Sequence, residues 1–177
     1  DAKSYAERLF DFPFIGPLGT EAASQALVKP LADESVAITP EALAELLRLT
    51  QGYPYFLQAW GSHTWLAAEA SPITLADVMK GSVTAIAALD EGFFRVRFDR
   101  CTPKEKKYLR AMAELGEGPH RSGDIADVLG EKVSSLAPTR STLIHKGMVW
   151  SPNHGDTAFT VPMFGAFMQR ILPDNWR

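Results

Sequence analysis

The stretch TPKEKKYLRAMAELGEGPHRSGDIADVLG, residues 102–130, decides the fold expected of the second half of the chain. It opens with a capping box, a hydroxyl followed three positions later by an acid, with a proline at the first helical position. This signal predicts a helix over 103–115 with apolar residues at helical spacing. A Gly- and Pro-containing loop follows at 116–119, and a shorter helix over 122–129 is ended by Gly130.

The residues that follow complete a pattern of mixed helices and strands. Spacing and start signals predict a third helix over 135–146 and two short β-like runs at 148–151 and 158–161. The segment PNHGD between these runs, residues 152–156, suits the turn of a β-hairpin. Pro162 is placed to open a final helix. The order helix, helix, turn, helix, hairpin, helix is typical of a winged helix-turn-helix domain.

The first half of the chain predicts a small bundle of helices. These helices are expected over 20–30, 40–51 and 54–69, and a fourth from residue 75 reaches Phe93 or beyond. Their start and stop residues are Thr20, Thr39, Pro40, Gly52, Pro54 and Thr74. The predicted fold class is therefore mainly α, a helical bundle followed by a winged helix-turn-helix with a β-hairpin wing.

Helical spacing also selects the residues that should be buried. In the first half these are Leu43, Leu46, Leu47, Leu49, Phe56, Leu57, Trp60, Trp65 and Leu66. In the second half they are Tyr108, Leu109, Met112, Leu115, Leu136, Leu143, Ile144, Phe164, Phe167, Met168, Ile171 and Leu172.

Charge changes along the chain and suggests where the domains divide. Residues 1–97 carry 7 Lys and Arg against 12 Asp and Glu, a net charge of −5, whereas residues 98–177 carry 11 against 9, a net charge of +2. We expect a connector or the tail of a preceding domain at 1–19, a helical domain at 20–97 and a winged-helix domain at 98–177. Any contact with a polyanion should involve the second half.

Several classes of function are disfavoured by what the sequence lacks. A single cysteine, Cys101, excludes an internal disulfide and suits a reducing cytoplasm. No apolar run approaches the roughly 20 residues of a membrane helix. There is no phosphate-binding P-loop, zinc-ligand spacing or nucleophile motif, so we expect no cofactor, no metal site and no independent enzyme in this chain. The absence of an initiator Met suggests a piece of a longer protein.

In a helix-turn-helix the second helix of the pair enters the major groove of duplex DNA, and the wing touches the adjacent backbone. The candidate nucleic-acid residues are Arg121, Ser135, Thr139, Arg140, Thr142, His145, Lys146, Asn153 and His154. Arg140 falls on the inner side of the helical wheel, so we expect it to pack along the helix pair and to pair with an acid in preference to reading a base. The wing tip either enters a groove or only turns the hairpin. Four cations of the first helix offer phosphate contacts or simply a solvated face; they are Lys104, Lys106, Lys107 and Arg110.

Three segments together resemble the C-terminal part of a P-loop ATPase of the AAA+/STAND superfamily, in the class related to origin-recognition initiators. SYAERLF, residues 4–10, looks like the tail of the nucleotide-binding core. LTQGYPYFLQAWG, residues 49–61, resembles the lid segment with its Gly-x-Pro signature. The stretch at 101–130, with LIHKGMVWSPNHGDTAFTVPMFGAFMQR at 143–170, resembles the appended winged helix.

The resemblance implies that Gly52, Tyr53 and Pro54 approach the base or sugar of a bound nucleotide. It places the Walker motifs, ATP or ADP and Mg²⁺ in an upstream core of the same polypeptide, outside this chain. Many such ATPases carry an arginine near this point to sense the γ-phosphate, whereas Tyr53, Tyr55 and Phe56 occupy this region here. This departure argues against phosphate sensing by the segment, and we expect apolar or stacking contact with the nucleotide instead.

Two functions follow from this organisation. In the first, the lid and a DNA-binding winged helix couple nucleotide state to DNA binding in a larger cytoplasmic ATPase. In the second, the winged helix is a protein-interaction or autoinhibitory module of a signalling ATPase. A positive face formed by Arg121, His145, Lys146 and the wing would favour DNA. An apolar patch including Trp150 would favour a partner protein.

Overall fold

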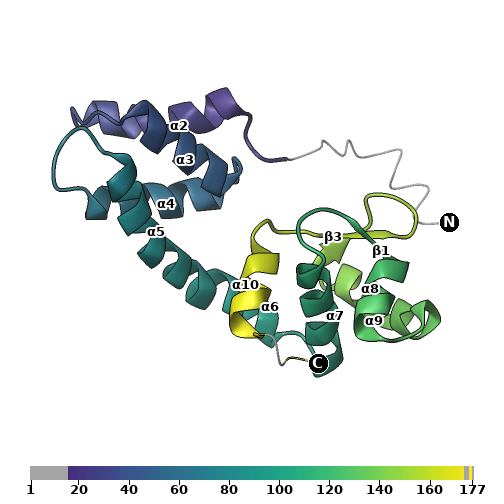
Figure 1. Cartoon of the computed structure of the whole chain (residues 1–177). Coiled ribbons are helices and arrows are strands. Elements are labelled where there is room, and N and C mark those ends of the chain that lie inside the picture. Colours follow the sequence, from purple (N-terminus) through teal and green to yellow (C-terminus); the bar gives the residue numbers. More distant parts are fainter. Residues whose placement is uncertain (1–15, 174–175, 177) are drawn as a thin grey trace. The chain divides into compact units, whose positions relative to one another are not determined.

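The computed structural model describes residues 16–173 and 176 of the chain. The chain divides into two compact units, Asp1–Ser82 and Val83–Arg177, and each is described by itself. Helices dominate both, with a small three-stranded antiparallel sheet in the second unit (Figure 1). The boundary expected between residues 97 and 98 falls within helix α6 (Arg95–Asp99), whereas the two compact units divide between Ser82 and Val83. The segment 4–10, expected to be the tail of a nucleotide-binding core, lies outside the described residues.

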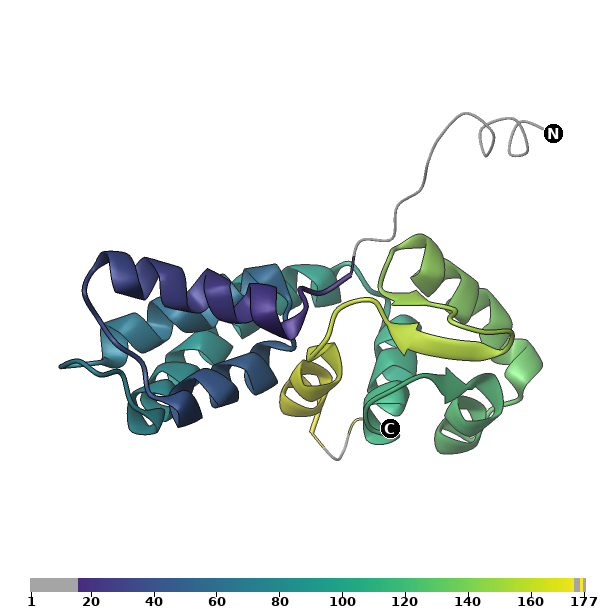
Figure 2. The same ribbon diagram turned by 90° about the horizontal axis from the view of Figure 1, so that it is seen from above.

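The first unit is built from α2 (Thr20–Asp33), α3 (Pro40–Thr50), α4 (Pro54–Ala67) and the start of α5 (Leu75–Leu89) (Figure 2). An aromatic cluster lies at its centre, with the Phe56 ring centroid 4.8 Å from that of Tyr53 and 6.2 Å from that of Trp60. A parallel bridge between Ile38 and Ile73 joins the loops that precede α3 and α5.

The start signals of these helices act largely as expected. The Thr39 hydroxyl accepts a hydrogen bond from the Ala42 N–H at 3.3 Å, and Pro40 is the first residue of α3. Asp77 accepts from both the N–H and the hydroxyl of Thr74 at 2.8 and 2.7 Å. Thr20, however, is the first residue of α2 and Gly19 is its N-cap, so the capping role expected of Thr20 is wrong.

Two residues expected in the core of α4 are instead exposed. Trp65 is 43% exposed and Leu66 76% exposed. The buried positions of this helix are Phe56, Leu57, Trp60 and Thr64. Because successive residues are about 100° apart on a helix, burying that face turns the following two residues away from it. The apolar content of α4 exceeds what one face can bury.

The second unit contains the remaining elements. The helices are η1 (Asp90–Phe94, a π-helix), α6 (Arg95–Asp99), α7 (Pro103–Glu114), α8 (Ser122–Leu129), α9 (Val133–His145) and α10 (Phe164–Ile171). The strands are β1 (His120–Arg121), β2 (Val149–Trp150) and β3 (Asp156–Phe159). They form an antiparallel sheet in the order β1-β3-β2, with His120 opposite Thr157 and Val149 opposite Phe159. β1 was not expected, because two residues carry no alternation that the sequence could display.

The core of this unit lies between α7 and α10, with η1 and α6 beside them. The Phe94 and Phe167 rings stack with centroids 5.3 Å apart, and Phe94 also meets Phe164 edge-on at 5.8 Å. Pro162 does not open α10, contrary to expectation; the helix begins at Phe164 after Met163, whose φ of 64° marks a left-handed N-cap. Within the part of the chain that the structure describes, no helix combines the length and apolarity needed to cross a membrane.

The capping box of α7 is fully formed. The Glu105 N–H donates to the Thr102 hydroxyl at 3.4 Å, and the Thr102 N–H donates to the Glu105 carboxylate at 2.6 Å. α8 and α9 each end before a glycine in the left-handed conformation, Gly130 and Gly147, as the sequence predicts. Both glycine stop signals predicted from the sequence are therefore confirmed.

Candidate functional site

α9 presents one buried and one exposed face. Its buried side chains are Leu136, Thr139 and Leu143. Its exposed residues include Ser134, Ser135, Ala137, Pro138, Ser141, Thr142, Ile144 and His145. Ile144 is 36% exposed, so its expected burial is wrong, because burial of Leu136, Thr139 and Leu143 leaves it at the edge of the packed face. The exposed face is rich in hydroxyl groups and small side chains.

Arg140 lies at the side of α9 and hydrogen-bonds to the β2–β3 hairpin. Its Nε donates to the Thr157 Oγ1 at 2.7 Å, and its Nη2 donates to the Ser151 Oγ at 2.8 Å and to the Asp156 carbonyl oxygen at 2.7 Å. The partners are two hydroxyls and a main-chain carbonyl. The expected pairing with an acidic side chain is therefore wrong, although the inward placement of Arg140 is as the wheel predicts.

The hairpin loop, residues 151–155, is held by short hydrogen bonds. The Ser151 Oγ lies 2.7 Å from the Asn153 carbonyl oxygen and 2.9 Å from that of Asp156. The N–H and hydroxyl of Ser122 also both donate to the Gly155 carbonyl oxygen of this loop, at 3.0 and 2.9 Å. Ser122 thus fastens the loop to the start of α8. At the tip, the side chains of Asn153 and His154 are exposed.

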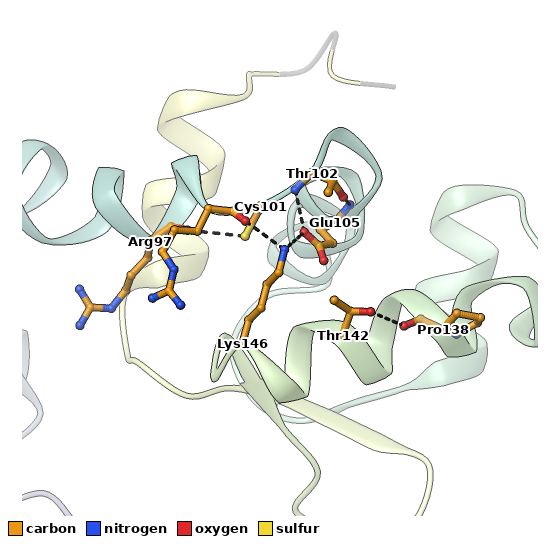
Figure 3. A network of polar contacts seen from close by, with 8 residues as sticks. Arg97, Cys101, Thr102, Glu105, Pro138, Thr142 and Lys146 are labelled. Carbon is orange, nitrogen blue, oxygen red and sulfur yellow. Dashed lines mark hydrogen bonds and ion pairs between the residues drawn. The ribbon is translucent and has the colours of Figure 1, made fainter.

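Lys146 follows α9 and contacts the start of α7 (Figure 3). Its Nζ lies 2.7 Å from the Glu105 Oε2 and donates to the Arg100 carbonyl oxygen at 3.0 Å. Burial alone would raise the pKa of the Glu105 carboxyl, but hydrogen bonds from Lys146 and Thr102 outweigh it and hold that pKa below its usual value. Burial raises the pKa of the neighbouring Cys101 thiol, with Glu105 adding to the shift.

The nine candidate nucleic-acid residues therefore fall into three groups. Six are exposed; they are Arg121, Ser135, Thr142, His145, Asn153 and His154. Arg140 and Lys146 are engaged with the hairpin and with α7. Thr139 is 9% exposed and lies in the core between α9 and its neighbours. Local spacing could not separate these groups. The partners of Arg140 lie 11 to 17 residues away in sequence, and those of Lys146 lie 41 and 46 residues away.

The cations of α7 are mostly occupied as well. Lys104 Nζ lies 3.4 Å from the Glu131 carboxylate, and Lys106 Nζ lies 4.0 Å above the Phe98 ring. Arg110, expected with them on an exposed face, is buried and donates to the Leu172 carbonyl oxygen at 2.7 Å. Lys107 is exposed. Arg110 therefore stabilises the packing of the chain end and offers no surface charge.

The Gly52–Tyr53–Pro54 corner has a clear structural cause. Gly52 has a φ of 70°, and a Cβ there would collide with the Leu18 carbonyl oxygen. The Leu18 N–H donates to the Gly52 carbonyl oxygen at 2.9 Å, which fixes this close approach. Pro54 is exposed as the first residue of α4, and Tyr53 is half-buried against Phe56.

A cavity of about 600 Å³ lies beside this corner, between α2, α3 and α4. It is lined by Leu18, Ala26, Leu27, Pro30, Leu31, Glu34, Ile38, Leu46, Pro54, Leu57, Gln58, Gly61, Ser62, Thr64, Trp65 and Ile73. Glu34 is the only charged residue among these described lining residues. Thr64 is only 1% exposed, and its hydroxyl has no hydrogen-bond partner within the described part of the chain.

Comparisons with known proteins give limited matches. Residues 91–168, which include α9 and the hairpin, match the model of a domain of unknown function, DUF8462. No curated protein matches the chain. The structure of a RuvB mutant from Thermotoga maritima is similar over 81% of this chain and 47% of that chain, with 15% identity and a TM-score of 0.42. This chain thus covers about half of that protein. Among residues 16–173 and 176 there is no cluster of His, Cys, Asp or Glu suited to a metal.

Proposed function

We propose that residues 98–177 form a winged helix-turn-helix that binds duplex DNA. The supporting observation is the order of elements from α7 to α10 together with the strand order β1-β3-β2. In this arrangement α8 and α9 are the helix pair and the β2–β3 hairpin is the wing. The exposed face of α9 would enter the major groove, and the hairpin loop would contact the flanking backbone.

The chemistry of the α9 face suits direct contact with bases more than strong electrostatic attraction. Thr142 and Ser141 can donate or accept hydrogen bonds at base edges, and Ala137 can contact a thymine methyl group. Exposed cations flank this face at Arg121 and Lys132. Because few cations are free, few phosphate contacts can form. The DNA affinity should therefore be modest, and it should decrease only weakly as the salt concentration rises.

A titration of the whole chain with duplex DNA at about 50 and 200 mM salt tests the proposal. We expect salt-sensitive binding that weakens by roughly tenfold when Thr142 and His145 are both changed to Ala. Thr20→Ala, an exposed threonine of α2, is the control and should bind as the parent chain does. No binding at the lower salt by the folded chain would contradict the proposal.

We further propose that residues 20–97 are the lid of a larger AAA+/STAND-type ATPase whose upstream core holds ATP or ADP with Mg²⁺. The support is the Gly52–Tyr53–Pro54 corner beside an apolar cavity. Because its described lining contains no cation, this surface suits a nucleotide base or sugar and leaves the phosphates to the core. Apolar volume of this size is within the range of small-molecule sites.

The lid proposal is tested in the longer protein that includes the upstream domain. There, Tyr53→Ala should weaken binding of a fluorescent ADP analogue by roughly fivefold, an order-of-magnitude expectation for one lost aromatic contact. Tyr55→Ala, at an exposed neighbouring position, is the matched control. Equal affinity of the parent and Tyr53→Ala proteins would remove the nucleotide role of the corner, without affecting the DNA proposal.

A second candidate function is supported by exposed apolar side chains in the same unit. Trp150 is 50% exposed on β2, an edge strand, and Ile144 is 36% exposed on α9. Exposed tryptophan is common at protein–protein contacts. If the winged helix docks on a protein or on its own ATPase core, Trp150→Ala should abolish that association while DNA titration shows no binding. Loss of DNA binding in Thr142→Ala/His145→Ala would instead favour the first function.

A further inference from the structure

We infer that Arg140 is a positioning residue that holds the wing against α9, and that it is not itself a reader of DNA bases. This inference rests on the proposed DNA binding and deepens it. Arg140 is the one arginine of α9 and would, from sequence, be the first choice for a base contact. Its hydrogen bonds assign it to the hairpin instead.

The Arg140 guanidinium does not have two neighbouring nitrogens with free N–H groups, which a bidentate contact with a base requires. Nε–H donates to the Thr157 hydroxyl, and the two N–H groups of Nη2 donate to the Ser151 hydroxyl and the Asp156 carbonyl oxygen. Bidentate recognition of guanine needs a free donor edge of the guanidinium. With Nε and Nη2 committed, only Nη1 is left for other contacts.

These contacts join α9 to both sides of the hairpin loop. Ser151 follows β2, whereas Asp156 and Thr157 begin β3, and Thr157 is fully buried. The same loop is also held by Ser122 through the Gly155 carbonyl oxygen. A loop fastened to α8 and α9 is ordered before it meets DNA, so the entropic cost of ordering it on binding is small.

The acceptors around Arg140 are neutral, which separates its geometry from its charge. A lysine at this position keeps the positive charge but can no longer bridge Thr157, Ser151 and Asp156 with a planar fork. Arg140→Lys therefore removes the clamp and preserves electrostatic attraction to phosphate. Arg140→Met removes both. The two variants distinguish positioning from a direct ionic contact.

The experiment measures duplex DNA affinity of the whole chain in a double-mutant cycle. It compares the parent, two single variants, Arg140→Lys and Arg140→Met, and the wing-tip double variant Asn153→Ala/His154→Ala. A triple variant combines the wing-tip changes with Arg140→Met. We expect Arg140→Lys and Arg140→Met to weaken binding by a similar factor, roughly fivefold to tenfold, and the wing-tip changes to add little once Arg140 is gone. The inference would be overturned if Arg140→Lys bound DNA as tightly as the parent and if the effects of Arg140→Met and of the wing-tip changes on affinity simply multiplied in the combined variant.

Amide hydrogen exchange of residues 151–157 without DNA supplies an independent readout. Exchange should be faster in Arg140→Lys than in the parent and unchanged in Lys132→Met, a control that removes an exposed cation at the start of α9. Equal protection in parent and Arg140→Lys would also overturn the clamp. If the parent binds no DNA, the proposed function fails, but the exchange data still decide whether Arg140 orders the wing.

Discussion

The Nζ atom of Lys146 lies 2.7 Å from the Oε2 atom of Glu105, which joins the residue after α9 to the first turn of α7 (Figure 3). Glu105 is 3% exposed and also accepts the Thr102 N–H, so one carboxylate closes a helix cap and an ion pair at once. A lysine on the predicted DNA-binding face is thereby committed to the interior contact between two helices.

We predict that Lys146→Met lowers the free energy of unfolding by about 2–3 kcal/mol, because it leaves a buried carboxylate without its cation. The side chain of Lys146 is 25% exposed, which keeps the expected loss below that of a fully buried pair. Urea denaturation followed by circular dichroism measures the change. Lys107→Met, at an exposed position on α7, should alter stability by less than about 0.5 kcal/mol. Equal effects of the two substitutions would contradict the structural role of Lys146.

The same carboxylate predicts a pH dependence. The pKa of Glu105 in the folded protein lies below the ordinary value of 4.5, so the unfolded chain binds its proton more readily. Its contribution to stability is therefore present above pH 4.5 and is lost as pH falls through the lowered pKa. Unfolding midpoints of the parent and Glu105→Gln should converge as pH falls below 4.5. A constant difference between them across that range would refute the assignment.

Gly52→Ala should destabilise the first unit by about 1–3 kcal/mol, since the new Cβ would collide with the Leu18 carbonyl oxygen and φ is 70°. Gly92→Ala is the matched control, because a Cβ at this helical glycine meets nothing within 4 Å. There the better helix propensity of alanine should stabilise the chain by about 0.5–1 kcal/mol. Thermal unfolding of the two variants gives opposite signs if the corner is set by this backbone approach.

Two buried threonines predict opposite responses to the same change. The Thr50 hydroxyl donates to the Leu46 carbonyl oxygen at 2.8 Å, whereas the Thr64 hydroxyl has no partner among the described residues. Replacing Thr64 with Val removes an unsatisfied polar group and should be neutral or stabilising by about 1 kcal/mol. Thr50→Val should instead lower the free energy of unfolding by about 1 kcal/mol, because it removes a made hydrogen bond. Chemical denaturation of both variants tests the difference, and a destabilised Thr64→Val would indicate that its hydroxyl has a partner after all.

Much of the helical fold could be predicted because its signals are local. The capping box at Thr102, the Pro40 start and the stops at Gly130 and Gly147 all act within one turn of helix. The errors came where local pattern is weak. β1 has two residues, and Met163 rather than Pro162 caps α10. Ile144, Trp65 and Leu66 were expected to be buried but are exposed. The reason is that apolar residues outnumber the positions that a single helix face can bury.

The candidate site was predicted less fully than the fold. Arg140 and Lys146 have the residue types of DNA-contacting side chains, but their hydrogen-bond partners lie far along the chain. Thr139 was placed at the interface and lies in the core. Side-chain chemistry selects which groups can make a contact, and packing decides which of those groups are still free.

The sequence by itself determined where most helices start and stop, because caps and glycine stops depend only on near neighbours. It also determined that the second half carries the more positive charge, which depends on composition alone. Only the tertiary structure decided that Arg140 holds the hairpin, that Lys146 neutralises Glu105 and that the Gly52 corner leans on Leu18. Each of these contacts brings together residues that are distant along the chain. Such pairings depend on how the elements pack, which no local pattern encodes.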